Sequence, residues 1–241
     1  MIGAAAQPQA AELSELAQQT LRELLRAWFE FERRLARVPI VQRLHSGTFT
    51  REDYLRLLLN LRQQVIEGSR WITRCASSFD RDYADVRSVI IGHAQDEHRD
   101  YEVLERDFVA SGGNLEQIRG KRRNPGSEAL HGFLMYRAGE PNPCGLLGAM
   151  WIIEGLGEKM ANDWAGRIES LTGLDASHTH FLRYHGENDG RHMDKMYRLL
   201  DRICTGEAVA ADILSVATVV GRLYALQLEE IDIGWHTDSI A

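Results

Sequence analysis

The chain has 241 residues, of which 44% are hydrophobic and 26% are charged, and it contains five tryptophans. A chain of this size and composition can bury a substantial core, as one large domain or two small ones. Its net charge of −7 excludes a general nucleic-acid-binding protein, because phosphate recognition requires a concentrated positive face.

Cysteine usage and the first residues bear on where the protein works. Cys75, Cys144 and Cys204 are far apart and form no C-x-x-C pair, so they predict neither a disulfide framework nor a cysteine metal motif. We expect a reducing, cytoplasmic setting. The opening MIGAAAQPQAAELSE lacks a basic start and a continuous apolar run, unlike a signal peptide. Because no stretch approaches about 18 uncharged apolar residues, we also expect no membrane-spanning helix and no membrane partner.

Helical periodicity runs through nearly the whole chain, which only five prolines interrupt. In TREDYLRLLL, Thr50 and Asp53 form a capping-box pair that begins a helix. Pro125 suits the first turn of another helix. It follows a short helical turn and the basic loop GKRRNP. We interpret this loop as solvated, and anion docking is the alternative. Such signals delimit about seven helices: residues 11–36, 50–77, 83–112, a helix from 125, 143–172, 177–204 and 208–235.

No alternating strand pattern, low-complexity tract or repeat of solenoid period is present in the sequence. The predicted loops are short, and no linker-like stretch divides the chain. We therefore predict a single all-α domain spanning residues 1–241, with residues 1–10 flexible.

The third predicted helix carries polar residues on its apolar stripe. Val86 and Ile90 begin that stripe, but His93, Glu97 and Asp100 occupy its next positions. An α-helix advances about 100° per residue, so positions i, i+4 and i+7 fall within an arc of roughly 60°. These three side chains therefore share the face that is expected to be buried, whereas His98 and Glu102 point elsewhere.

The sixth predicted helix repeats this arrangement in the stretch HGENDGRH. His185, Asp189 and His192 again stand at i, i+4 and i+7 within an apolar stripe, while Glu187 and Asn188 fall off that face.

Glu154 is a further case on the fifth predicted helix. It lies in the apolar run MWIIEGLG, where Gly155 and Gly157 allow a neighbouring element to approach closely.

Seven imidazole and carboxylate groups thus lie on inward faces of three helices. Each alone is most simply a core polar group bonded to a backbone carbonyl or an arginine, but seven would need repeated coincidences, and these stripes carry no Lys or Arg. Facing helices of a bundle supply such ligands to pairs of iron or manganese ions. The absence of cysteine argues against structural zinc, and the mixture of His and carboxylates suits iron or manganese, although spacing alone leaves zinc open.

The pattern resembles the heme-oxygenase-like diiron oxidases and oxygenases, relatives of heme oxygenase, thiaminase II and pyrroloquinoline-quinone synthesis protein C. The resemblance runs from about Val41 to Cys204, and its most specific part is His185-x3-Asp189-x2-His192 preceded by Glu154. The segment HAQDEHRDYEVLERDFVASGG is similar to the first ligand helix of that family.

One position departs from the family pattern. Many members carry a His three residues after the Glu of the first ligand helix, but here Glu97 is followed by Asp100. Either Asp100 takes the place of that His, or His93 supplies the imidazole one turn earlier. His98 would serve only if the helix were locally deformed.

The resemblance implies a non-heme enzyme with two irons per chain, or with manganese, that uses dioxygen on a small metabolite, such as an amino-acid-derived or natural-product intermediate. An external electron donor and a homodimer are further expectations. The alternatives are a metal-free thiaminase II-like or cofactor-independent enzyme of the same fold, and a noncatalytic ligand-binding protein. Heme oxygenase itself fits less well, since His45 falls at a helix end, and thiaminase chemistry would require a cysteine nucleophile in the cavity.

Overall fold

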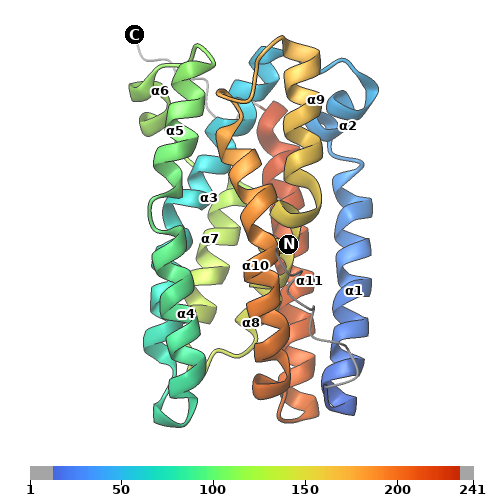
Figure 1. Cartoon of the computed structure of the whole chain (residues 1–241), viewed down its shortest axis with the longest axis vertical. Helices are drawn as coiled ribbons and strands as arrows, with labels where there is room; N and C mark the ends of the chain where they lie inside the picture. The colour runs from blue at the N-terminus through green and yellow to red at the C-terminus, as the bar shows by residue number, and fades with distance from the viewer. Residues whose placement is uncertain (1–12, 234–241) are drawn as a thin grey trace, which may run out of the picture.

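Eleven α-helices make up most of residues 13–233, the part of the chain that the computed structural model describes. No strand occurs within this range, so the predicted all-α fold is confirmed (Figure 1). In chain order the helices are α1 (Glu15–Leu35), α2 (Pro39–Ser46), α3 (Arg51–Ser78), α4 (Ala84–Glu97), α5 (Asp100–Ala110), α6 (Leu115–Gly120), α7 (Pro125–Ala138), α8 (Leu146–Leu156), α9 (Asn162–Thr172), α10 (His180–Ile203) and α11 (Glu207–Glu229). The expectations about residues 1–10 and Trp235 lie outside the described residues.

Local capping explains several helix boundaries. The hydroxyl of Thr50 accepts a hydrogen bond from the Asp53 backbone N–H, and the Asp53 carboxylate accepts one from the Thr50 N–H, so the predicted capping box begins α3. Asn124 caps α7 directly before Pro125, which occupies the first turn as predicted.

Three features differ from the predicted helices. A separate helix, α2, begins at Pro39 and ends at Ser46, and the next residue, Gly47, has a φ of 79° that suits glycine. The third predicted helix breaks at His98–Arg99 into α4 and α5. The fifth contains a π-helical turn, η3 (Gly157–Ala161), between α8 and α9. All seven predicted segments are helical, and the larger number of helices comes from α2, from the short α6 and from these two interruptions, across which periodicity continues.

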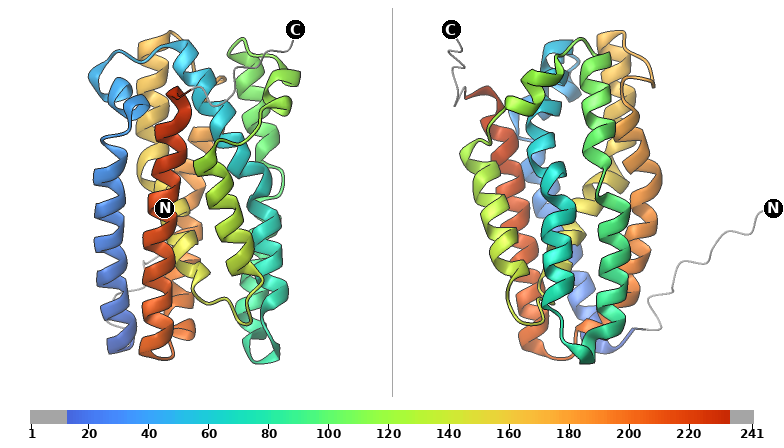
Figure 2. Two further views of the ribbon diagram at one scale, coloured as in Figure 1. Left: turned by 180° about the vertical axis from the view of Figure 1, so that it is seen from behind. Right: turned by 90° about the vertical axis from the view of Figure 1, so that its left-hand side faces the viewer.

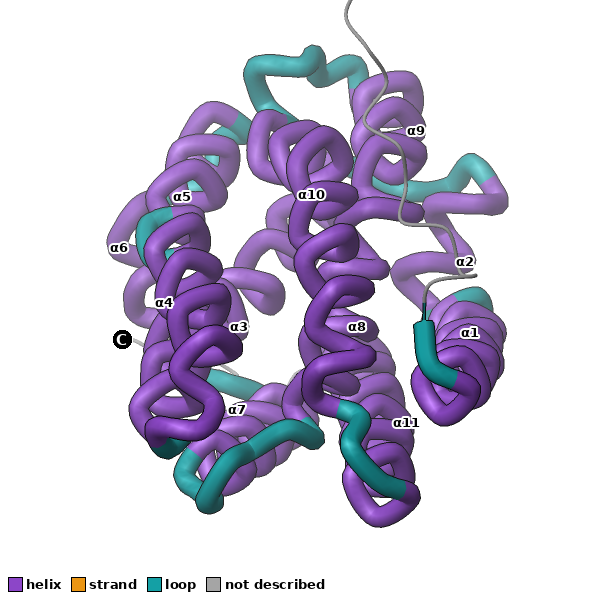
Figure 3. Tube along the Cα trace, turned by 60° about the horizontal axis from the view of Figure 1, so that its bottom comes forward, coloured by secondary structure: helices purple, strands orange, loops and turns teal. Residues whose placement is uncertain are grey.

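The long helices run along one axis of the bundle and enclose the core (Figure 2). α11 packs against α1, α7 and α8, and α3 packs against α4, α5 and α7. α10 crosses the front of the bundle in Figure 1 and contacts α4, α5, α8, α9 and η3. Viewed along the bundle in Figure 3, α4 and α5 lie on the opposite side from α8 and α11, and α10 contacts elements of both sides. The space between α4, α8 and α10 is where the inward polar groups meet.

Two expectations about the surface need correction. α11 and the following turn, Glu207–Asp232, are long and apolar enough by length and composition to cross a membrane, so the expectation of no such segment was too strong. A core helix of a soluble protein passes the same test, and one face of α11 is buried against its neighbours. The basic loop is only partly solvated, since Arg123 pairs with the buried Glu67 at 2.8 Å.

A buried carboxylate on α5 positions the start of α10. Asp107 Oδ2 accepts a hydrogen bond of 2.7 Å from the backbone N–H of Phe181, in the first turn of α10. Burial raises the pKa of Asp107 to about 7, against the effect of that hydrogen bond. Asp107 therefore holds a proton in the folded protein at a pH where an unfolded aspartate has lost it.

This shift predicts a pH-dependent stability difference for Asp107→Asn. An unfolded aspartate ionises near pH 4 and folded Asp107 near pH 7, so the wild type loses stability as pH rises through that window. Asn keeps the acceptor without titrating. We expect its unfolding free energy relative to wild type to rise by about 2 kcal/mol between pH 4 and pH 8, since the helix N-terminus offsets part of the full shift. Urea unfolding at several pH values measures this, and a constant difference between the two proteins would contradict it.

Candidate metal centre

All seven residues singled out in the sequence lie between α4, α5, α8 and α10, and none of them is fully exposed. The set is His93, Glu97, Asp100, Glu154, His185, Asp189 and His192. Two subsets bring ligand atoms within 4.8 Å of one another: His93, Glu97, Glu154 and His192, and Glu97, Asp100 and His185. Glu97 belongs to both subsets, as a bridging carboxylate would.

The first subset is centred on Glu154. Its Oε1 lies 3.2 Å from His93 Nε2, and its Oε2 lies 2.8 Å from His192 Nδ1. Glu97 Oε1 is 3.5 Å from the same His192 Nδ1. The two imidazole rings pack edge to face with centroids 4.6 Å apart. Two carboxylates and two imidazoles thus converge on one small volume from three helices.

The second subset joins the two ends of the helix break to α10. His185 Nε2 lies 3.3 Å from Asp100 Oδ2 and 4.0 Å from Glu97 Oε2. His185 Nδ1 lies 2.9 Å from the Phe181 carbonyl oxygen, to which it donates. That bond leaves Nε2 unprotonated at neutral charge and aims it at the two carboxylates, as metal-binding histidines are usually oriented.

The break at His98–Arg99 changes how the third predicted helix approaches the cluster. Both residues that the sequence left as alternatives are in place, since His93 lies in the first subset and Asp100 in the second. The helix is deformed at His98, but that side chain is exposed, with Nδ1 3.0 Å from the Gln95 carbonyl oxygen. His98 is therefore not part of the cluster. Glu187, which was predicted to face away, is also exposed.

Asp189 is buried beside the π-helical turn. A Cβ added at Gly157 would overlap the Asp189 carboxylate, so only glycine permits this approach. The close neighbour that the sequence predicted for Gly157 is therefore the Asp189 side chain on α10. Single π-helical turns are frequent at functional sites. Asp189 Oδ1 lies 3.8 Å from His192 Nδ1, next to the first subset.

Several buried ligand atoms have no hydrogen-bond partner among the described residues. They include His93 Nδ1 and Asp189 Oδ1, whereas His93 Nε2 and Asp100 Oδ2 make only the ion-pair contacts with Glu154 and His185 given above, which lack hydrogen-bond geometry. A buried polar group without a partner costs about 1–3 kcal/mol. Metal ions would satisfy the carboxylate oxygens and one ring nitrogen of His93, and the oxygen and imidazole donor set suits iron or manganese. The residues present therefore fit a metal-binding site.

The protonation of the cluster in the absence of metal also supports a metal site. Burial, and next the charge of Glu154, raise the pKa of Glu97 to about 8 and that of Asp189 to about 9. Burial also opposes ionisation of Glu154, but His93 and His192 outweigh it and hold its pKa well below its usual range. Neighbouring carboxylates cannot all ionise in so small a volume unless cations replace the protons.

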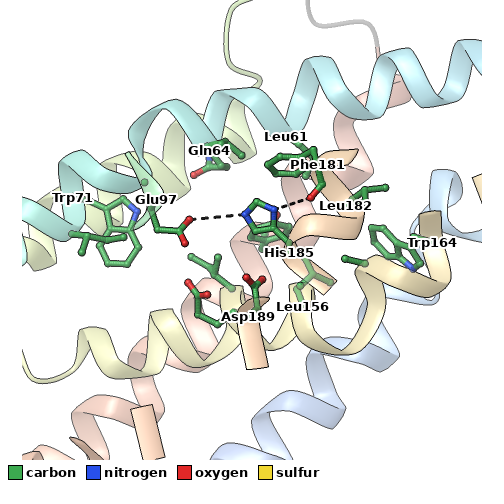
Figure 4. Close-up of a pocket in the computed structure, with 18 residues that line it drawn as sticks. Leu61, Gln64, Trp71, Glu97, Leu156, Trp164, Phe181, Leu182, His185 and Asp189 are labelled. Carbon is green, nitrogen blue, oxygen red and sulfur yellow. Dashed lines mark hydrogen bonds and ion pairs between the residues drawn. The ribbon is translucent and has the colours of Figure 1, made fainter. Parts of the chain in front are cut away.

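An apolar cavity of about 110 Å³ adjoins the cluster. Glu97, His185 and Asp189 lie on its wall between Trp71 and Trp164 (Figure 4). Phe181 also lines it, whereas Met150 and Trp151 are buried core residues that do not.

Sequence reasoning missed the α3 wall of this cavity. That wall includes Leu61, Gln64, Gly68 and Trp71. The available signal was a glycine in the apolar stripe of the second predicted helix, at a position where a core helix usually carries a larger residue.

No protein-family model matches the chain, and no curated protein matches it in sequence. Solved structures do match. A protein of unknown function with a heme oxygenase-like fold from Shewanella denitrificans aligns with a TM-score of 0.82 at 17% identity, over 88% of this chain and 91% of that one. A TenA homologue from Pseudomonas syringae pv. tomato aligns with a TM-score of 0.71 at 15% identity, over 96% and 98%.

A second TenA homologue, from P. horikoshii, aligns with a TM-score of 0.67 at 14% identity, over 89% of this chain and 99% of that one. At such identities the likeness concerns the fold and not the reaction. The chain has the heme oxygenase-like fold that the resemblance implied.

Proposed function

We propose that the protein is a non-heme dinuclear iron oxidase or oxygenase that uses dioxygen on a small molecule, with manganese as the alternative metal. The observation that carries this proposal is the pair of ligand subsets sharing Glu97, with unpartnered buried atoms, beside an apolar cavity. His93, Glu154 and His192 would hold one ion, and Asp100 and His185 the other, with Glu97 between them and Asp189 adjacent to both.

The bound ions would supply the redox chemistry that activates dioxygen. The chain itself positions the ligands, keeps water out and provides the substrate space. The hydrogen bond from His185 to Phe181 orients one imidazole, and Asp107 anchors the first turn of the helix that carries it. The cytoplasmic setting, an external electron donor and a homodimer belong to this proposal as expectations.

A metal-free enzyme resembling thiaminase II is the second candidate, favoured by the TenA homologues among the similar structures. It would use His and carboxylate groups as general acids and bases together with a cysteine nucleophile. Cys75, Cys144 and Cys204 are buried, and no cysteine is among the described residues that line the cavity. Burial raises the pKa of both the Cys75 and the Cys144 thiol, which lowers their nucleophilicity at neutral pH.

The test is anaerobic loading with Fe(II), removal of unbound metal, and measurement of iron content and dioxygen uptake. We expect about two iron equivalents per chain and dioxygen consumption on exposure to air. Protein that retains no iron would overturn the proposal and favour the metal-free alternative.

Glu97→Gln, with Glu102→Gln as the matched control, tests the bridging position. Glu97 lies within both ligand subsets, whereas Glu102 pairs with Arg99 at the surface. Because Glu97 would contact both ions, we expect its replacement to lower iron affinity at least about tenfold and to leave less than one equivalent bound. Glu102→Gln should retain the wild-type iron content. Equal iron loss in both variants would contradict the bridging role.

A further inference from the structure

A glycine interrupts the face of α3 that lines the cavity beside the ligand cluster. Gln64, Val65, Trp71 and Ile72 line the cavity from this face. Gly68 also lines the cavity. It lies at the centre of this face, with Gln64 and Val65 four and three residues before it and Trp71 and Ile72 three and four residues after it. Glycine in a helix interior is destabilising relative to alanine, so its presence here needs a reason.

The space beside Gly68 is open. A Cβ added at this residue would meet no atom of residues 13–233 within 4 Å, in contrast to Gly157, where it would overlap Asp189. Close packing of a neighbour therefore does not explain Gly68. A larger side chain at this position would instead project into the cavity and fill it.

The charge of the walls limits what the cavity accepts. No lysine or arginine is among the described residues that line it. The carboxylates on its wall, Glu97, Glu154 and Asp189, belong to the ligand cluster. Two divalent cations there would neutralise the charge of these three groups and of Asp100. Gln64 Nε2 donates to Ser127, which leaves its Oε1 to accept a hydrogen bond from a ligand. A charge on the part of a ligand that lies against the apolar walls, away from the cluster, would lose hydration without gaining a partner there.

The size of the cavity limits the ligand further. An apolar cavity of about 150 Å³ holds one benzene molecule. The present cavity, at about 110 Å³ and lined partly by half-buried residues, suits one small ring or a short aliphatic chain.

We infer that this cavity binds an uncharged, mainly apolar molecule, or the apolar part of one, with about one ring's volume, and that Gly68 sets the available space. As the substrate class of the enzyme, this inference rests on the proposed function. Binding of a ligand in the cavity depends on the residues that line it, so it can be measured independently of iron binding and dioxygen uptake.

Three probes of one ring size but different charge test the inference: benzyl alcohol, benzylamine and benzoate, titrated calorimetrically into Fe(II)-loaded and metal-free protein at pH 7. With the loaded protein we expect benzyl alcohol to bind at least about tenfold more tightly than either charged probe. Tightest binding by benzoate or benzylamine would overturn the assigned ligand class.

Gly68→Leu should weaken benzyl alcohol binding at least about tenfold in both metal states while leaving the iron content unchanged. Gly132→Leu is the control, since Gly132 is an exposed helical glycine that is also open on its Cβ side. Gly68→Ala should give a smaller loss of affinity and a higher Tm, which keeps the test valid should the leucine variant misfold. Unchanged affinity in folded Gly68→Leu would overturn the role of Gly68.

The two proposals fail in different ways. Iron binding without benzyl alcohol binding would overturn the cavity inference alone. Benzyl alcohol binding that Gly68→Leu removes, in a protein that retains no iron, would support the cavity and overturn the proposed function.

Discussion

Glu154→Ala is expected to remove iron from the first ligand subset. Glu154 lies 3.2 Å from His93 and 2.8 Å from His192 and is only 5% exposed, so its loss leaves the two imidazoles without the group between them. We expect at least one of the two iron equivalents to be lost and dioxygen uptake to fall at least about a hundredfold. Metal analysis of the variant after anaerobic loading, with circular dichroism to confirm folding, measures this.

Glu158→Ala is the matched control for that substitution. Glu158 lies one turn further along, in the π-helical segment, and is exposed. Its replacement removes the same charge, and surface substitutions usually change stability by less than about 0.5 kcal/mol. Wild-type iron content in folded Glu154→Ala would show that Glu154 is only a buried acid paired with two histidines.

Gly157→Ala is expected to displace Asp189 from the cluster. The added methyl group would overlap the Asp189 carboxylate, which is the end of a flexible side chain and moves more easily than the backbone. Gly166→Ala is the control, because Gly166 is helical and exposed and an added Cβ would meet no atom of the described residues within 4 Å. We expect Gly157→Ala to weaken iron binding at least about tenfold, and Gly166→Ala to raise stability slightly.

Binding of about two iron equivalents by Gly157→Ala with wild-type affinity would count against a role for Asp189 as a ligand. Helical content and Tm of both variants separate this effect from general unfolding, since both replace a helical glycine by alanine.

The inward positions of the seven polar residues were predictable because helical periodicity depends only on sequence spacing. His185, Asp189 and His192 lie on one unbroken helix, so the arc argument applies to them directly. The arc argument does not apply directly to Asp100, because a helix break separates it from Glu97. No capping residue marks that break, because Arg99 makes no side-chain cap, and periodicity alone therefore missed it.

The sequence could not predict which residues of different helices come together in each ligand subset. Whether Glu154 contacts His93 or His185 depends on how α4, α8 and α10 cross, which is set by packing between distant segments. The cavity was missed for a similar reason. Gly68 is visible in the sequence as a gap in the stripe, but the gap becomes a binding space only because the opposing helices leave it open.

Anomalous X-ray diffraction at the iron edge, from crystals of anaerobically loaded protein, tests the central claim most directly. We predict two peaks, one between His93, Glu154 and His192 and the other between Asp100 and His185, with Glu97 between the peaks and about 3.5–4 Å separating them. Loaded protein without an anomalous peak at these residues would contradict the dinuclear metal centre.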